Sequence, residues 1–266
     1  MRLLDSRTVR PAARQRALTL LELMVAMSLL TVIVLGLYTM FNQTQAALRS
    51  GNTAVDVSEN ARAAMELLIR ELEQMRPTGQ TNGTNFYVEP NRVGYPLVQT
   101  LVDGTRVTNQ LQTFFFLTKQ TDWKAIAYVV SWASTNPADY PLLTNGVGTL
   151  SRIEFTTNHL TMTNNNLFNL YWNAPIASYS RVADGIVHLN LRAFDTNGVF
   201  LDTNSYAYTS NALPAYLEVE LGVLEPNVLE QARAIPSTAA SSNFLAQQSS
   251  KVHLFRQRIP IRTAGR

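Results

Sequence analysis

Residues 14–38 of the chain read RQRALTLLELMVAMSLLTVIVLGLY, an apolar run that carries one carboxylate, Glu22, near its start. The nineteen residues 23–41 contain no formal charge. As a helix they would extend about 28 Å, enough to cross a hydrocarbon core of about 30 Å. Positively charged residues are retained in the cytoplasm, and five arginines precede the run: Arg2, Arg7, Arg10, Arg14 and Arg16. The sequence therefore predicts a single-pass membrane helix with a cytoplasmic N-terminus.

Two ordinary interpretations of such a segment are a signal anchor and a secretory signal peptide. A cleavage site of the small-x-small type is present at residues 44–46. However, the apolar core of a signal peptide usually has about 7–15 residues, fewer than this run contains. An acidic side chain at the centre of a membrane helix also costs about 2.5–3.5 kcal/mol, so Glu22 calls for a positively charged partner.

A cleaved N-terminus would supply that partner. If the chain is cut after Ala17, the α-amine of Leu18 lies four residues from Glu22, about one helical turn away. In a helical stack of subunits, Glu22 of one chain would equally reach the amine of its neighbour. Such pairing compensates both charges and sets the axial register between subunits.

The stretch RALTLLE at residues 16–22, followed by the apolar helix, resembles the signature of type IV prepilins and type II secretion pseudopilins. The resemblance implies cleavage between Ala17 and Leu18 by a membrane prepilin peptidase, and N-methylation of Leu18 by the same enzyme. It also implies that Glu22, with Thr19 in the same motif, makes the assembly contact. The family usually has Gly at the position of Ala17 and Phe or Met at that of Leu18.

Three further stretches are similar to the minor pseudopilin J and related large minor pilins. They are ENARAAM at residues 59–65, VADGIVHL at 182–189 and LPAYLEVE at 213–220. This similarity implies a subunit at the tip of a short periplasmic filament. The implied partners are the prepilin peptidase and methyltransferase, other pilin or pseudopilin subunits and an inner-membrane assembly platform. The implied location is the bacterial inner membrane, with a periplasmic globular domain, and then an envelope filament.

Beyond the apolar run the pattern becomes periodic. Apolar residues recur at spacings of three and four, which predicts an amphipathic helix: Val57, Ala61, Ala64, Met65, Leu68, Leu72 and Met75. Alternating charges occupy the opposite face, and RPTG at residues 76–79 marks the end of the helix. A continuous helix from Leu18 to Met75 would span about 85 Å.

Strand patterns dominate from residue 86 onward. Alternating or apolar segments lie at residues 123–134, 150–155, 186–194, 216–224 and 252–261, and three consecutive aromatic residues at 114–116 indicate a buried strand. The segment 226–234 is expected to be a short helix, and the Ser- and Ala-rich residues 236–250 a mobile loop. Asp184 and Gly185 are interpreted as turn residues.

These patterns predict an α+β fold: a long N-terminal helix, transmembrane and then amphipathic, packed on a mostly antiparallel β-sheet. The expected parts are a cleaved basic leader at residues 1–17, a transmembrane and assembly helix at 18–41, an amphipathic helix at 42–76 and an extracytoplasmic globular domain at 77–266.

Little in the sequence favours catalysis. The chain has no cysteine, and its three histidines, His159, His188 and His253, are scattered without a metal-ligand spacing. No nucleophile-elbow, phosphate-loop or dinucleotide motif is present. We therefore expect neither an enzyme nor a cofactor. A weak calcium candidate remains in the oxygen-bearing side chains of Asp195, Asn197 and Asp202, although a hairpin turn explains this segment as well.

The charge distribution argues against nucleic-acid binding. The first 17 residues hold five arginines and one acidic residue, whereas the remainder has 17 basic and 18 acidic side chains. The resemblance thus favours a minor pilin or pseudopilin of a type II secretion pseudopilus. Three alternatives stay open: a pilus subunit for adhesion, motility or DNA uptake (with Arg256, Arg258 and Arg262 as its basic cluster), a non-polymerising signal-anchored binding module, and a secreted enzyme.

Overall fold

The computed structural model describes residues 19–90, 96–101, 103–131, 146–157, 166–175, 178–200 and 206–262, and for residues 49, 50, 52–58 and 238 it describes the backbone alone. The chain forms two compact units, Met1–Gly51 and Asn52–Arg266. Helix α1 (Leu20–Leu72) contributes residues to both units.

The first part of α1 is apolar all round. Its segment Leu20–Leu48 is long and apolar enough to cross a membrane, by length and composition, and none of its most apolar window is buried within the structure. Hydroxyl side chains in this segment bond to carbonyls of the preceding turn: Thr31 Oγ1 donates to Met27 O at 2.8 Å, and Thr39 Oγ1 to Gly36 O at 2.8 Å. Each hydroxyl is therefore satisfied within the helix, as an apolar environment requires.

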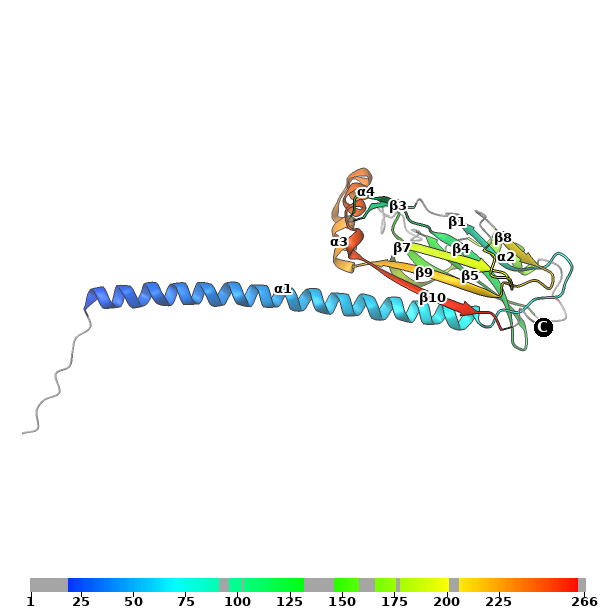
Figure 1. Ribbon diagram of the computed structural model, residues 1–266, viewed down its shortest axis with the longest axis horizontal. Helices are drawn as coiled ribbons and strands as arrows, with labels where there is room; N and C mark the ends of the chain where they lie inside the picture. Colours follow the sequence, from blue (N-terminus) through cyan, green and yellow to red (C-terminus); the bar gives the residue numbers. More distant parts are fainter. Residues whose placement is uncertain are drawn as a thin grey trace, which may run out of the picture. The chain divides into compact units, whose positions relative to one another are not determined.

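The second unit is built on a large antiparallel sheet (Figure 1). Among the described residues eight strands pair in the order β10-β9-β7-β6-β5-β4-β1-β8. Their bounds are β1 Thr84–Pro90, β4 Gln112–Lys119, β5 Trp123–Ser131, β6 Gly148–Thr157, β7 Ser180–Phe194, β8 Tyr206–Thr209, β9 Tyr216–Leu224 and β10 Val252–Pro260. A separate hairpin joins β2 (Val98–Thr100) to β3 (Arg106–Thr108).

The sheet curls, because the start of β4 reaches across to the middle of β7. The Leu189 N–H donates to Gln110 O at 2.7 Å, and Leu111 forms a parallel bridge with Leu189. The buried side chain of Gln112 accepts a bond from the Leu191 N–H at 2.5 Å. These bonds satisfy backbone groups of β7 where β6 no longer pairs with it, since the β6–β7 register ends at Ile186.

The apolar face of the second part of α1 covers the inner face of the sheet. Ala61, Ala64, Met65, Leu68 and Leu72 of α1 are buried in one core cluster, together with Met75 just beyond the end of the helix. The cluster also contains Phe114 and Phe116 of β4 and Leu189 and Leu191 of β7. The α+β arrangement predicted from the sequence is confirmed, and so is the apolar stripe of the helix from Ala61 to Leu72. The side chain of Val57, also predicted for the stripe, lies outside the described residues, and Met75 lies beyond the end of α1.

A polar contact fixes the helix on the sheet. The Glu71 carboxylate of α1 accepts a hydrogen bond from Tyr128 Oη at 2.5 Å and pairs with Arg152 at 2.8 Å. Burial, together with the neighbouring Glu71 carboxylate, raises the pKa of Tyr128, so its hydroxyl stays a donor. Arg152 and Lys124 also hold Glu154, at 2.6 and 2.7 Å. The helix is thus positioned by packing and by charge together.

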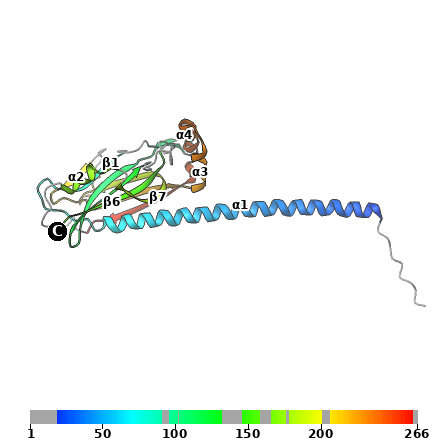
Figure 2. The same cartoon turned by 180° about the vertical axis from the view of Figure 1, so that it is seen from behind.

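Three short helices pack against other parts of the sheet domain. Helix α2 (Asn166–Trp172) packs on the opposite face of the sheet (Figure 2). There Phe115 meets Phe168 and Tyr171 at ring-centroid distances of 5.3 and 5.1 Å. Phe115 and its two neighbours are all fully buried, so the sequence interpretation of this strand is confirmed. Helices α3 (Pro226–Ala234) and α4 (Thr238–Ala246) lie together at one end of the sheet (Figure 1).

Two expectations are wrong. Residues 236–250 are not a loop: the Ser237 side chain caps α4 by accepting from the Ala240 N–H, and Ser241 Oγ donates to Ala232 O at 3.0 Å. Asp184 and Gly185 do not form a turn but lie inside β7, where Gly185 has a φ of +75°. A side chain at Gly185 would be strained and would lie 3.2 Å from Leu224 O.

We predict that Leu68→Ala lowers the free energy of unfolding by about 2–5 kcal/mol, because Leu68 is fully buried between α1 and the sheet. The measurement is chemical unfolding of the full chain in detergent, followed by circular dichroism. Leu254→Ala is the control, since Leu254 is 58% exposed, and it should cost well under 1 kcal/mol. Equal effects of the two substitutions would contradict the packing described above.

Candidate processing and assembly site

Thr19 and Glu22 meet at the N-terminus of α1. The Thr19 N–H donates to Glu22 Oε2 at 3.1 Å, and the Glu22 N–H donates to Thr19 Oγ1 at 3.3 Å. The Thr19 hydroxyl lies 3.3 Å from the same carboxylate oxygen, and Thr19 O accepts the first helical bond, from the Leu23 N–H at 3.2 Å. This reciprocal arrangement is a capping box, which satisfies two backbone donors that the start of a helix leaves unpaired.

The same geometry leaves hydrogen-bond acceptor sites free on the Glu22 carboxylate. Its carboxylate sits in the first turn, where the helix dipole favours negative charge, and its side chain is exposed. Only Oε2 is bonded in the cap, and a carboxylate has about four acceptor sites in total. Glu22 therefore remains able to accept an ammonium group while it caps its own helix.

The processing role predicted for Ala17 and Leu18 and the assembly role predicted for Thr19 and Glu22 stay predictions. Thr19 and Glu22 are brought together at the helix start, as the motif indicated. Ala17 and Leu18, the expected cleavage residues, lie outside the described residues.

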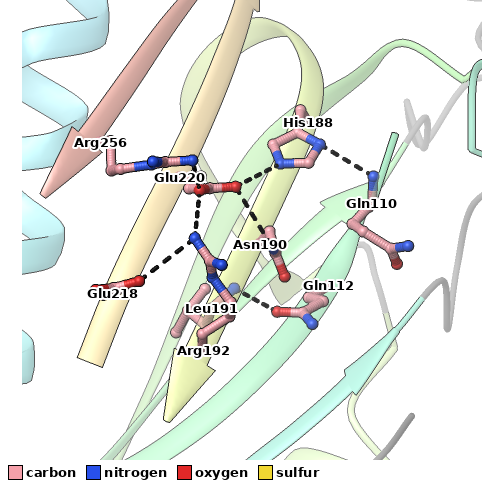
Figure 3. Close-up of polar contacts among 9 residues, drawn as sticks. All are labelled: Gln110, Gln112, His188, Asn190, Leu191, Arg192, Glu218, Glu220 and Arg256. Atoms are coloured by element: carbon pink, nitrogen blue, oxygen red, sulfur yellow. Dashed lines mark hydrogen bonds and ion pairs between the residues drawn. The ribbon is translucent and has the colours of Figure 1, made fainter. Parts of the chain in front are cut away.

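A second polar cluster, which sequence reasoning missed, lies on the outer face of the sheet around Glu220 (Figure 3). Arg192 contacts Glu220 at 2.6 Å and Glu218 at 3.3 Å, and Arg256 also contacts Glu220. The Glu220 carboxylate is further bonded by Asn190 and by Nε2 of His188, both at 3.4 Å. Its side chain is only 9% exposed, so these partners compensate a largely desolvated charge.

The pKa shifts in this cluster follow from burial and neighbouring charge. Burial alone would raise the pKa of Glu220, but the charges of Arg192 and Arg256 and the bonds from Asn190 and His188 outweigh it and lower the pKa. Burial lowers the pKa of His188, despite its contact with Glu220. Nδ1 of His188 accepts from the Gln110 N–H at 3.1 Å, which leaves the proton of the neutral ring on Nε2, facing Glu220. The cluster is therefore a structural ion-pair network around Glu220, and His188 takes part in it as a neutral ring.

In the weak calcium candidate, the Asp195 carboxylate accepts hydrogen bonds from the backbone of a tight turn. Oδ1 of Asp195 accepts bonds from the N–H groups of Asn197 and Val199, each at 2.8 Å, and Gly198 has a φ of +76°. This is the tight turn expected from the sequence. Asp202 lies outside the described residues, and within those residues no group of three or more metal-ligating His, Cys, Asp or Glu side chains occurs.

We predict a loss of stability on acidification that depends on His188. The unfolded chain binds a proton near pH 6.5, whereas the lowered pKa keeps folded His188 neutral to a lower pH. Stability is therefore fully present above pH 6.5 and falls as the pH drops from 6.5 toward the folded pKa, with a slope of at most about 1.4 kcal/mol per pH unit.

Comparing the melting temperature of wild type and His188→Gln between about pH 6.5 and pH 5 tests this, because the variant lacks the titrating ring. His253→Gln is the matched control. The wild type should lose more stability than His188→Gln across this window, and parallel curves would contradict the assignment.

Three comparisons with known proteins bear on these observations. Residues 12–38 match the family described as the prokaryotic N-terminal methylation motif. No curated protein matches the chain. Among solved structures, a type IV-like pilin from Thermus thermophilus is similar, with 10% sequence identity, coverage of 79% of this chain and 97% of that chain, and a TM-score of 0.38. That likeness is too low to transfer any property of the other protein.

The family match covers the capping box and the first part of the membrane-length helix, which continues to Leu48. The residues that follow the match form the rest of α1 and an antiparallel sheet domain, and the second part of α1 packs on the sheet. The chain therefore carries the prokaryotic N-terminal methylation motif at the start of a helix that is long and apolar enough to cross a membrane.

Proposed function

We propose that the chain is a minor pilin or pseudopilin subunit, made as a precursor, cut between Ala17 and Leu18, methylated on the new amine and assembled into an envelope filament. The methylation motif at residues 12–38 is the observation that carries this proposal. The exposed, membrane-length apolar helix that overlaps it supports the same role, since one apolar surface serves in lipid before assembly and among neighbouring helices afterwards.

In this proposal Glu22 sets the register between subunits. Cleavage places a positive amine at Leu18, directly before the capped Thr19. Because the capping box leaves acceptor sites on the carboxylate, Glu22 pairs with the amine of a neighbouring subunit without uncapping its own helix. An unpaired carboxylate in the apolar bundle is costly, so subunits out of register are disfavoured.

The proposed partners and location follow from this processing. A prepilin peptidase and methyltransferase cuts and modifies the precursor in the inner membrane, and an assembly platform then inserts it among other pilin-like subunits. The N-terminus is cytoplasmic, because the arginines precede the helix, and the sheet domain is periplasmic. The large sheet domain favours a minor subunit at a filament tip.

Between the alternatives, we favour a secretion pseudopilus over a DNA-uptake pilus. Acidic side chains interrupt the basic cluster that would serve DNA binding: Glu220 lies opposite Arg256 and contacts it, and Glu218 lies opposite Arg258. DNA binding draws its affinity from many phosphate contacts, and these carboxylates would repel the phosphates.

Intact mass spectrometry of the chain extracted from host membranes tests the processing step. We expect a chain that begins at Leu18 and carries one added methyl group. An Ala17→Leu variant, with a bulky residue at the cut, should retain Met1. A native chain that begins near Ala47 would indicate a secretory signal peptide, and an intact Met1 would indicate a signal anchor; either result refutes the proposal.

The assembly role of Glu22 is tested by Glu22→Gln, which keeps an acceptor for the Thr19 N–H but removes the charge. We expect normal cleavage and about a tenfold or larger drop in the share of subunits recovered in sheared filaments, because the buried amine loses its counter-charge. Glu66→Gln is the matched control, as Glu66 is an exposed glutamate on the same helix. Equal recovery of the two variants would refute the role given to Glu22.

A further inference from the structure

The sheet ends on one side in a long strand with an open edge. β10 pairs with β9 over nine consecutive residues without a bulge, and no strand in the described part of the chain pairs with its other side. The opposite edge strand, β8, has only four residues. Alternate N–H and C=O groups along an edge strand point away from the sheet, so β10 offers the longer row of backbone donors and acceptors.

The side chains beside this edge are accessible on the outer face. Leu254 is 58% exposed, and the side chain of Arg256 is 63% exposed. Next to Leu254, β9 carries Gly222, which has no side chain. The inner side of β10 is fixed in the core, because Ile259 is fully buried there. The inner face of β10 is thus held in the core, and its outer face is accessible.

Charges alternate from strand to strand across this face. The first row contains Arg192 of β7, Glu218 of β9 and Arg258 of β10, which lie directly opposite one another. In the second row Asn190, Glu220 and Arg256 are opposite, and in the third His188, Gly222 and Leu254. Figure 3 shows the side chains of Arg192 on β7 and Arg256 on β10 in contact with Glu220 on β9, between them.

We propose that the free edge of β10 binds an extended segment of another protein chain by adding it to the sheet. In that segment two acidic residues, separated by one position, lie opposite Arg258 and Arg256, and an apolar residue two positions further lies opposite Leu254. The charge alternation in the first two rows carries this choice of occupant: these rows read positive or polar, negative, positive, and a further strand continues them with negative charge.

Backbone pairing supplies the affinity in this mode, and the side chains supply the specificity. Arg258 contributes more to the specificity for the bound segment than Arg256 does. Its guanidinium stacks on the Tyr216 ring at 3.6 Å, and this leaves the guanidinium edge able to donate to a carboxylate. Arg256 is shared with Glu220 and contributes less. This inference does not depend on the proposed function, since it rests on the sheet alone.

The test uses the full chain in detergent micelles and a fluorescent peptide of alternating Thr and Val that carries the order glutamate-x-glutamate-x-leucine. We expect the peptide to bind, and the version with lysine in place of glutamate to bind about tenfold more weakly. A version with methylated backbone nitrogens should also lose binding, because it cannot pair as a strand. Fluorescence anisotropy measures each affinity.

Protein variants locate the site. Arg258→Glu should weaken the glutamate peptide about tenfold and strengthen the lysine peptide, and Arg258→Gln should do the first without the second. Arg106→Glu is the matched control, because Arg106 is an exposed arginine on the separate hairpin, and it should change neither affinity. Binding that ignores the peptide charge, survives backbone methylation or is unchanged in Arg258→Glu would overturn the proposal, as would no binding at all.

Discussion

The whole sheet domain depends on the one-sided burial of the second part of α1. The inner face of the sheet presents a continuous apolar surface, and in the described residues the stripe from Ala61 to Met75 covers it. Small residues at Ala61 and Ala64 allow close approach, while Leu68, Leu72 and Met75 fill the space toward the helix end. Because this helix meets the need for burial on one face, the strands at the β7–β9–β10 end can place their charges on the other.

Features that depend on local periodicity were predictable. The stripe of α1, the strands at residues 216–224 and the helix at residues 226–234 are read from spacing alone, and the structure has them. Helix α4 was missed because its sequence, TAASSNFLA, has hardly any apolar periodicity; its cap on Ser237 and the bond from Ser241 to Ala232 define it instead. The start of β7 was missed because Asp-Gly is typical of a turn, whereas here Gly185 passes Leu224 O inside a strand.

The two polar sites also differ in how far they could be predicted from the sequence. Thr19 and Glu22 are one helical turn apart in the sequence, so their contact follows from the helix itself. The Glu220 cluster joins residues from β7, β9 and β10, with Gln110 from the segment before β4, and depends on a register that no short motif encodes. Alternation placed Glu220 on the outer face, but a carboxylate there is normally solvated, and nothing local in the sequence indicates that its neighbours bury it.

The order of the elements, with β10 later in the sequence than β9, α3 and α4, has a kinetic consequence. A polypeptide is made from its N-terminus, so β9 and helices α3 and α4 emerge before the strand that pairs beside them. Until β10 arrives, the core lacks Ile259 and Ile261, and Glu220 lacks one of its two arginines. The sheet therefore stays incomplete until β10 has been synthesised, and a nascent chain that has not yet reached β10 exposes the edge of β9 to any strand nearby, including that of another nascent copy.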